Sequence, residues 1–368
     1  MKIIVYDDNP DFGGHQVMSV LGVQAIAADP AHQVVFLLHP DNRGLKARLD
    51  LAGNIQLADT PCMTRRLQGI RSRINRRGIK TLCRLLQSHQ ADLLLCIQGD
   101  IEQSSQALIA AHRIGLECVS YLALPHTMRS MGARMGRLRD RINQPMIQLP
   151  DRYITISSGM ADMLRARGAS QPITVVPNGI AAPRISGSAQ QKQGFVLGML
   201  GRIELKQKRQ DFVVRAFAEH RQVFEACSLL IAGSGPDRNA LQQLIDAHPF
   251  HSRIQLVAWQ QDPEIFYAGI DMLAVPSRYE GVPLVMLEAL ARRIPVIASN
   301  RDGMQEILPA DWTFDPDDTA SFVSTFNRVS TTWHDSIDAL RERVMHEHSL
   351  ERFNRNFVRA VVDGESDA

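Results

Sequence analysis

Short apolar runs rich in β-branched residues recur along the chain, separated by longer segments with the spacing of amphipathic helices. The first half holds KIIVYDD, QVVFLLH, NIQLAD, ADLLLCIQ, ECVSYLAL and RYITIS, and the second half holds FVLGMLGR, SLLIAGSG, RIQLVAW, DMLAVPS and IPVIAS. Runs that are apolar throughout indicate strands buried on both faces, as in parallel sheets. Their alternation with segments such as GHQVMSVLGVQAIAA and DRNALQQLIDAH predicts βαβ units in a doubly wound α/β fold.

The alternation is interrupted once, over residues 177–194, where PNGIAAPRISGSAQQKQG is rich in Pro, Gly, Ser and Gln. A chain of 368 residues is too long for one ordinary core, so we interpret this segment as a linker between two similar domains. We expect an N-terminal Rossmann-like domain over residues 1–175 and a C-terminal one over residues 176–349. Ligands of such sheets bind at the carboxyl ends of the strands, so the default site is the cleft between the domains.

Composition narrows the class of protein. With 45% hydrophobic and 22% charged residues the chain is typical of soluble globular proteins. No apolar run is long enough to span a bilayer, and the N-terminal MKIIVYDDNP is read as a strand rather than a signal peptide, so we expect a cytoplasmic protein. The five cysteines are odd in number and none forms a C-x-x-C pair, which argues against a disulfide framework or a structural zinc site.

The net charge of +2 conceals an uneven distribution. Between Asp59 and Asp92 there is no acidic residue, while the basic residues are Arg65, Arg66, Arg71, Arg73, Arg76, Arg77, Lys80 and Arg84. A second basic run follows at Arg129, Arg134, Arg137, Arg139 and Arg141. The first run fits either a solvated helix face or contact with an anionic membrane surface, which arginines favour. Nucleic acid is disfavoured, because interleaved aromatic residues are missing and the isoelectric point of about 8.3 is modest.

Three predicted strands of the second half end in segments that should meet at one edge of a sheet. GRIELKQKRQD places Arg202 and Lys208 after one strand, GSGPD forms a glycine turn after another, and YEGVPLVMLEA follows a third. Two cations at the start of a helix make a site for a diphosphate. The helix should begin at Pro283.

This helix start would also offer the N–H groups of Leu284 and Val285 to a diphosphate. Glu288, deeper in the helix, can accept hydrogen bonds from ribose hydroxyls, and Glu280 at its mouth can contact the group that the diphosphate carries. The alternative is that these carboxylates only stabilise the helix dipole and that the cations are solvated.

Two further patterns are weaker. GSGPD lacks the third glycine of the G-x-G-x-x-G fingerprint, which disfavours a nicotinamide enzyme. DPDD, residues 315–318, contains an Asp-x-Asp pair but is interpreted as a surface loop rather than a metal site.

The motifs together resemble one family. EGVPLVMLE is similar to the E-x7-E motif of retaining glycosyltransferases with the GT-B fold, and the chain resembles glycosyltransferase family 4. FGGHQ (residues 12–16) is similar to the N-terminal Gly-Gly loop of that family, LPHT (residues 124–127) to its histidine segment, VVPNGI to its hinge and GRIELKQKRQD to its phosphate-binding segment. These elements stand in the family's order over most of the chain.

The resemblance implies two Rossmann-like domains facing each other across a cleft, with a helix at about residues 350–368 packing back on the N-terminal, acceptor-binding domain. Arg202 and Lys208 would bind the donor diphosphate, approached by the backbone of Gly13 and Gly14. Glu288 would hold the ribose. The resemblance gives His126 and Glu280 the catalytic roles beside the donor sugar.

The expected activity is retaining transfer of a hexose or hexose derivative from a nucleotide-diphosphate sugar to a glycan or lipid-linked acceptor. This would serve surface polysaccharide or glycolipid synthesis at the inner membrane face, with no metal or other cofactor. A nucleotide-sugar epimerase, a phosphorylase, or an inactive partner of another transferase are alternatives on the same fold. The sequence leaves open the base, the sugar, the acceptor and the oligomeric state.

Overall fold

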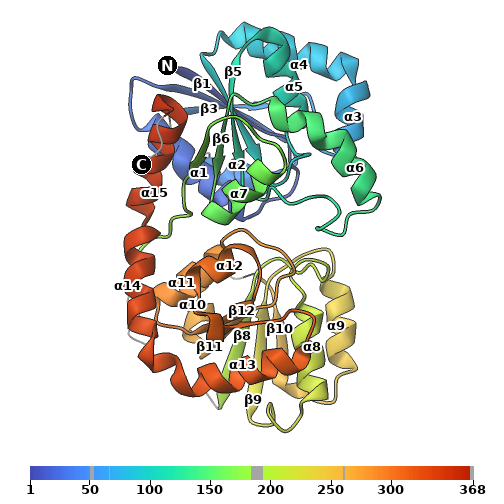
Figure 1. Ribbon diagram of the computed structural model, residues 1–368, viewed down its shortest axis with the longest axis vertical. Helices are drawn as coiled ribbons and strands as arrows, with labels where there is room; N and C mark the ends of the chain where they lie inside the picture. Colours follow the sequence, from blue (N-terminus) through green and yellow to red (C-terminus); the bar gives the residue numbers. More distant parts are fainter. Residues whose placement is uncertain (50–53, 66, 184–193, 260–261, 365–368) are drawn as a thin grey trace. The chain divides into compact units, whose positions relative to one another are not determined.

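The computed structural model describes residues 1–49, 54–65, 67–183, 194–259 and 262–364. Arg66 and most of the expected linker, residues 184–193, therefore lie outside the described residues. The chain divides into two compact units, which are described separately (Figure 1). Unit 1 comprises Met1–Gly179 and Leu350–Ala368, and unit 2 comprises Ile180–Ser349.

Unit 1 is built on a sheet with the strand order β3-β2-β1-β4-β5-β6-β7, in which every pairing is parallel. Its strands are β1 (Lys2–Asp7), β2 (Gln33–Leu38), β3 (Ile55–Asp59), β4 (Leu93–Gln98), β5 (Glu117–Leu122), β6 (Arg152–Thr155) and β7 (Ile173–Val175). Its helices are α1 (Gly14–Ala27), α2 (Arg43–Leu49), α3 (Gln68–Ile74), α4 (Arg76–His89), α5 (Ser105–Ile114), α6 (Gly136–Asn143), η1 (Gln144–Gln148), α7 (Ser158–Ala166), α15 (Leu350–Val358) and η5 (Arg359–Asp363).

Unit 2 has a second parallel sheet, with the order β10-β9-β8-β11-β12-β13. Its strands are β8 (Phe195–Leu200), β9 (Cys227–Ala232), β10 (Ile254–Val257), β11 (Met272–Val275), β12 (Val296–Ser299) and β13 (Thr313–Phe314). Its helices are α8 (Gln210–Glu219), α9 (Arg238–Asp246), η2 (His251–Arg253), α10 (Pro263–Ala268), α11 (Leu284–Ala291), α12 (Asp302–Ile307), η3 (Ala310–Trp312), α13 (Thr319–Thr332), η4 (Trp333–Asp335) and α14 (Ile337–Glu347).

The prediction of two doubly wound α/β domains is confirmed, and each apolar run singled out in the sequence contains a strand. The sequence missed β7 and β13, which stand at the ends of their sheets. Both are short, three and two residues, and each pairs with one neighbour only. An edge strand of this length has no extended apolar run to reveal it.

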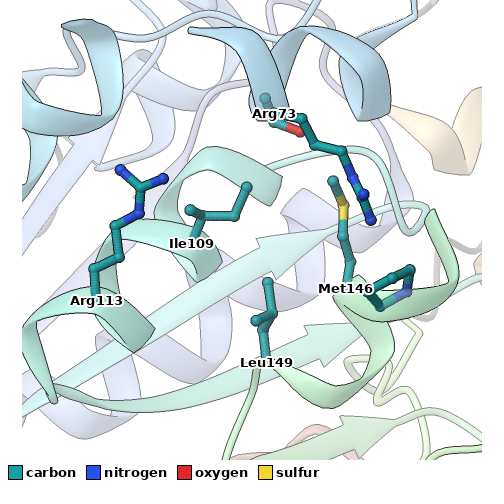
Figure 2. Close-up of a pocket in the computed structure, with 7 residues that line it drawn as sticks. Arg73, Ile109, Arg113, Met146 and Leu149 are labelled. Carbon is teal, nitrogen blue, oxygen red and sulfur yellow. The ribbon is translucent and has the colours of Figure 1, made fainter. Parts of the chain in front are cut away.

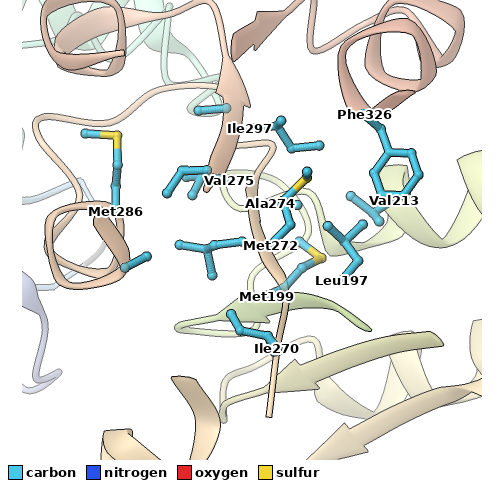
Figure 3. Packing of buried hydrophobic residues seen from close by; sticks show 14 of the residues in the cluster. Leu197, Met199, Val213, Ile270, Met272, Ala274, Val275, Met286, Ile297 and Phe326 are labelled. Atoms are coloured by element: carbon cyan, nitrogen blue, oxygen red, sulfur yellow. The ribbon is translucent and has the colours of Figure 1, made fainter. Parts of the chain in front are cut away.

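The core of unit 2 shows why the strands are apolar on both faces (Figure 3). Met272 and Ala274 of β11 lie between helices, with Met286 of α11 on one side and Val213 of α8 and Phe326 of α13 on the other. All of these side chains are buried. Burying both faces of the sheet leaves little room for polar side chains along the strands and favours the strand ends for polar chemistry.

The last helix of the chain completes unit 1 by packing against α1. The ring of Phe357 in α15 lies where a Cβ on Gly22 would come within 2.3 Å of it. The same ring meets Tyr121 of β5 edge to face, with centroids 5.6 Å apart. Arg152 of β6 donates from Nη1 to the carbonyl of Ala360 over 2.8 Å.

Two further observations bear on the class of protein. Among the described residues, no helix combines the length and the apolar character needed to cross a membrane. The five cysteines, Cys62, Cys83, Cys96, Cys118 and Cys227, are free thiols, as the sequence indicated.

The contact between Gly22 and Phe357 makes the packing of α15 testable. We expect Gly22→Val to lower the free energy of unfolding by about 1–3 kcal/mol, because the new side chain overlaps a buried ring. Phe357→Leu in the same chain should recover part of the loss by making room. Chemical denaturation measures both, and a Gly22→Val chain as stable as wild type would contradict the contact.

Candidate functional site

The strand order of unit 2 reverses beside β8. The chain passes from β8 to β9 and β10 on one side and then crosses to β11 on the other. Such a reversal opens a crevice at the carboxyl ends of the two central strands, where ligands of α/β sheets bind. The segment carrying Arg202 and Lys208 follows β8, and the segment carrying Glu280 follows β11.

The loop after β8 is held by the glycine turn after β9. A Cβ on Gly233 would lie 1.9 Å from the carbonyl oxygen of Gly201, so the two backbones can approach only with glycine at this position. Ile203 N donates to Ser234 O over 2.9 Å, and Leu205 N donates to the Asp237 carboxylate over 2.8 Å. The turn GSGPD therefore supports the loop that carries Arg202 and Lys208.

The structure brings Lys208 and Glu280 together as an ion pair between Nζ and Oε1. Glu280 is only 7% exposed. Its Oε1 also accepts a hydrogen bond from Ser277 Oγ over 2.9 Å, and its backbone N–H donates to Asp302 Oδ2 over 2.8 Å. Glu280 is thus fixed at the sheet edge by side chain and backbone alike, through Ser277 and Asp302, which were not predicted from the sequence.

Arg202 lies at the same edge but is more open to solvent. Its side chain is 44% exposed, and its Nε lies 3.6 Å from Glu204 Oε2. The backbone carbonyl of Arg202 accepts from Gln210 Nε2 over 2.8 Å, which ties this loop to the start of α8. An exposed guanidinium on an anchored backbone is well suited to meet an anion.

Helix α11 begins one residue later than the sequence suggested. Pro283 has ψ 126°, outside the helical range, and is the N-cap rather than the first helical residue. Its carbonyl accepts the first helical bonds, from Met286 N over 3.1 Å and Leu287 N over 3.3 Å. Leu284 and Val285 fill the first turn, where backbone N–H groups have no carbonyl one turn back to donate to.

Glu288 lies deeper in α11, beside α10. Tyr267 of α10 donates its hydroxyl to Glu288 Oε2 over 2.6 Å, and Arg292 Nη1 donates to the Glu288 carbonyl over 2.7 Å. Burial raises the pKa of the Glu288 carboxyl above its ordinary value, against the opposing effects of Tyr267 and Arg292. The carboxylate is therefore held in one orientation by Tyr267, which no sequence motif singles out.

A second charged cluster flanks this region. Arg209, 7% exposed, pairs with Asp317, and its guanidinium lies 5.0 Å over the ring of Phe212. Hydrogen bonding to Arg209 lowers the pKa of Asp317. Asp317 belongs to the DPDD segment, which is a loop before α13. Among the residues that the structure describes, no cluster of three or more His, Cys, Asp or Glu side chains is arranged to hold a metal ion.

In unit 1 the strand order reverses beside β1, between β2 and β4. Gly13 and Gly14 follow β1 at this reversal, with Gly13 as the N-cap of α1 and Gly14 as its first residue. His15, next along the chain, lies against the backbone of Gly99 after β4, and burial lowers its pKa to about 4. The glycine loop thus sits at the predicted edge of the sheet.

His126 follows β5 on the same edge and is 4% exposed. The preceding Leu124 donates its N–H to Gly99 O over 3.1 Å. Arg167 reaches back from the end of α7 and donates from Nη1 to Pro125 O over 2.6 Å and His126 O over 2.8 Å. Arg167 therefore fixes the loop that carries the histidine, a role that sequence spacing could not reveal.

A separate pocket of about 300 Å³ lies in unit 1 among α3, α5 and η1 (Figure 2). Ile109, Met146 and Leu149 form its apolar floor, with Arg73 and Arg113 at opposite sides. None of the candidate site residues lines it. The pocket is thus distinct from the two sheet edges described above.

Comparison with known proteins identifies the protein family to which the chain belongs. A model described as Glycosyltransferase Family 4 matches residues 20–183, and one described as Glycosyl transferases group 1 matches residues 194–331. Together they span most of both units, and the chain belongs to this glycosyltransferase family, with the GT-B fold of two Rossmann-like domains.

Solved structures share this fold. The apo lipopolysaccharide outer core galactosyltransferase WaaB is 21% identical, with a TM-score of 0.71 over 99% of this chain and 100% of its own. Anabaena Alr3699/HepE, solved in complex with UDP and glucose, is 16% identical, with a TM-score of 0.79 over 98% of this chain and 99% of its own.

Curated relatives align over varying lengths. The Escherichia coli O-antigen biosynthesis glycosyltransferase WclY is 32% identical over 26% of each chain. An uncharacterized glycosyltransferase of Methanocaldococcus jannaschii is 32% identical over 32% of this chain and 29% of its own. The chain thus aligns with less than a third of the length of these two relatives. The lipopolysaccharide 1,6-galactosyltransferase of E. coli K12 is 24% identical over 77% of this chain and 79% of its own.

The contact between Lys208 and Glu280 predicts a measurable coupling. In a double-mutant cycle of Lys208→Met and Glu280→Gln, we expect a coupling of about 1–3 kcal/mol in the free energy of unfolding, because removing either partner leaves a charge unpaired near the protein interior. The surface pair Arg293–Asp338, with side chains 57% and 66% exposed, is the matched control and should couple by less than about 1 kcal/mol. If the Lys208–Glu280 and Arg293–Asp338 pairs couple equally, burial does not strengthen the interaction between Lys208 and Glu280.

Proposed function

We propose that this protein is a retaining glycosyltransferase. It moves a hexose or hexose derivative from a nucleotide-diphosphate sugar to a glycan or lipid-linked acceptor, in the synthesis of a surface polysaccharide or glycolipid. The observation that carries the proposal is the meeting of Lys208 and Glu280, 72 residues apart in sequence, at the strand-order reversal of unit 2. The names of relatives in O-antigen and lipopolysaccharide synthesis support the substrate class.

In this proposal the donor diphosphate binds beside Arg202 and Lys208. The N–H groups of Leu284 and Val285 at the start of α11 complete the anion site. Lys208 exchanges its ion pair with Glu280 for the phosphate oxygens, and Glu280 accepts hydrogen bonds from hydroxyls of the donor sugar. Fixed cations then stabilise the charge that develops as the bond between the sugar and the phosphate breaks.

The remaining steps need no protein nucleophile. The acceptor hydroxyl attacks the anomeric carbon from the face that the phosphate leaves, and its proton passes to a phosphate oxygen. Glu288 holds the ribose and is oriented by Tyr267. In unit 1, the backbone of Gly13 and Gly14 approaches the diphosphate and His126 hydrogen-bonds the sugar or acceptor. The proposed chemistry uses no metal and no other cofactor.

Two alternatives would behave differently in simple assays. An epimerase converts the nucleotide sugar without releasing a nucleoside diphosphate, and an inactive partner binds the donor but does not turn it over. A thermal-shift screen with UDP, GDP and ADP identifies the base, with UDP first because HepE was solved with it. A nucleotide at a hundred times its dissociation constant should stabilise the chain by about 2.7 kcal/mol.

The two glutamates provide the decisive test. Glu288→Gln should weaken binding of donor and free nucleotide alike, because ribose does not change during the reaction. Glu280→Gln should lower kcat while free nucleotide still binds at least as well as in wild type, because Lys208 is released from its ion pair. Arg202→Ala should weaken nucleoside-diphosphate binding about tenfold or more.

Two quantities are measured for each variant: the nucleotide affinity, by calorimetry, and kcat, from the release of nucleoside diphosphate. The exposed Glu342→Gln in α14 is the control and should match wild type. If Glu280→Gln weakens nucleotide binding and Glu288→Gln only lowers kcat, the two glutamates have each other's roles. If both variants behave like wild type, the proposed site is wrong.

The pH dependence of binding tests Glu288 in a second way. Burial raises the pKa of the Glu288 carboxyl, and only the ionised carboxylate accepts hydrogen bonds with both oxygens. Nucleotide binding should therefore weaken as pH falls through that pKa in wild type but not in Glu288→Gln.

We also propose that unit 1 contacts an anionic membrane surface. Helices α3 and α6 cross closely, since a Cβ on Gly69 would lie 1.9 Å from Asn143 Oδ1. Together they expose Ile74, Met135 and Leu138 at 72%, 53% and 45%. The same two segments carry exposed arginines: Arg71 and Arg73 in the first basic run, and Arg134, Arg137 and Arg141 in the second. Apolar side chains among arginines suit the headgroup region of acidic lipids.

The rest of the first basic run, Arg65, Arg76, Arg77, Lys80 and Arg84, would add to the attraction. Sedimentation with vesicles of phosphatidylglycerol and phosphatidylcholine tests it. Arg134→Gln with Arg137→Gln should weaken binding about tenfold or more, and Ile74→Ser with Leu138→Ser should also weaken it. Ile265→Ser, at a residue of unit 2 exposed to 53%, is the control. Equal binding to vesicles of phosphatidylcholine alone would rule out the electrostatic contribution.

A further inference from the structure

Strand β1 ends in two adjacent buried carboxylates, Asp7 and Asp8, which are 1% and 0% exposed. The proposed chemistry uses neither. A carboxylate so deeply buried is tolerated only when its oxygens accept hydrogen bonds. Oδ1 of Asp7 accepts from the N–H of Asn9 over 2.9 Å, and Oδ2 accepts from Gln16 Nε2 over 3.0 Å. Both oxygens of Asp7 are therefore committed to N–H donors.

Gln16 connects Asp7 to the glycine loop by hydrogen bonds. Its side chain is 0% exposed, and its Oε1 accepts from the N–H of Gly13 over 2.6 Å. Because the amide donates to Asp7 at one end and accepts from Gly13 at the other, only one of its two flip states satisfies both contacts. The carbonyl of Gly13 in turn accepts from the N–H groups of Gln16 and Val17, each over 3.1 Å. Gly13 is thus held through both of its backbone polar groups.

Two consecutive glycines need such an anchor. Glycine loses more conformational freedom on folding than any other residue, so a Gly-Gly turn has little intrinsic preference for one backbone conformation. In this chain Gly13 is extended, with φ −151° and ψ −178°, and has no side chain with which to cap α1. Gln16, held by Asp7, instead accepts from the backbone N–H of Gly13 and so ties the N-cap residue to the first turn of α1.

We propose that Asp7 and Gln16 are positioning residues that fix the Gly13–Gly14 backbone in the conformation that meets the donor diphosphate. The proposal rests on the proposed function, which gives this loop its role. Asp7 acts only through Gln16, and neither side chain touches the donor.

The neighbouring Asp8 provides a contrast. Its Oδ1 accepts from Thr64 Oγ1 and from the N–H of Ser104, so it joins the end of β1 to the segments after β3 and β4. No hydrogen bond recorded for Asp8 involves Gly13, Gly14 or Gln16. Asp8 is thus a control of matching chemistry and burial.

Exchanging the carboxylate and the amide between positions 7 and 16 tests the contact between Asp7 and Gln16 alone. Asp7→Asn introduces an NH₂ group where both oxygens accept, so either the Asn9 N–H or the Gln16 amide loses its acceptor. Gln16→Glu places a second carboxylate against Asp7. In the chain with both changes, the new amide can donate to the new carboxylate, whose other oxygen still accepts from Gly13 N–H. The double variant therefore restores a hydrogen bond at each contact, with donor and acceptor exchanged between positions 7 and 16 and the N–H of Gly13 still donating to position 16.

The experiment measures hydrogen exchange and donor kinetics on the full chain. Mass-spectrometric exchange over residues 9–20, without nucleotide, reports the protection of the Gly13 N–H. Each single variant should exchange about tenfold faster in this segment and show a raised KM for donor, and the double variant should return both values to within a few-fold of wild type. Asp8→Asn should leave exchange in this segment unchanged. The thermal midpoint of each variant is recorded alongside.

Three outcomes overturn the proposal. In the first, the single variants show the same hydrogen exchange over residues 9–20 as wild type. In the second, the double variant exchanges as fast as the single variants. In the third, exchange rises in the single variants and recovers in the double variant, but KM for donor stays at the wild-type value throughout. Failure of the proposed function is read separately: wild type then releases no nucleoside diphosphate, and Arg202→Ala binds nucleotide like wild type. Exchange alone still reports whether Asp7 and Gln16 hold the loop, because it is measured without a donor.

Discussion

The structure depends on the burial of two parallel sheets on both of their faces. Every strand pairing recorded for the described residues is parallel, and the strands are enclosed by helices. Side chains along such strands must be apolar, so polar groups gather where the strands end. The order of each sheet reverses once in the middle, beside β1 in unit 1 and beside β8 in unit 2. Gly13, Gly14, Arg202, Lys208 and Glu280 follow strands at these two reversals, His126 follows the neighbouring strand β5, and Glu288 lies within α11.

At the edge of unit 2, opposite charges lie together in pairs. Lys208 satisfies Glu280, and Arg209 satisfies Asp317. An unpaired charge near the protein interior would be costly, so each pairing stabilises the charges placed there. In the function we propose, the donor diphosphate replaces Glu280 as the partner of Lys208, so binding exchanges one partner for another. Glu288 differs, because the side chain that donates to its carboxylate, Tyr267, is neutral, and the nearby cation Arg292 donates to its backbone carbonyl instead.

The sequence predicted what is local and missed what joins distant segments. The apolar runs located the strands, and the positions of Arg202, Lys208 and Glu280 after β8 and β11 followed from them. The contacts of Tyr267 with Glu288 and of Arg167 with the His126 loop join residues 21 and 41 apart, which no spacing rule connects. Asp7 and Gln16 were missed for another reason: a polar residue beside a strand end is ordinarily solvated, and only packing shows that these are buried.

The return of α15 to unit 1 has a consequence for synthesis on the ribosome. The groove on α1 at Gly22 is filled by Phe357, which is translated after every residue of unit 2. While the nascent chain lengthens through residues 180–349, unit 1 still lacks α15, and the surface of α1 at Gly22 stays uncovered until unit 2 has been synthesised in full. Unit 1 is the first to be synthesised and the last to be completed, so a chaperone that covers α1 during elongation would protect an uncovered apolar surface from aggregation.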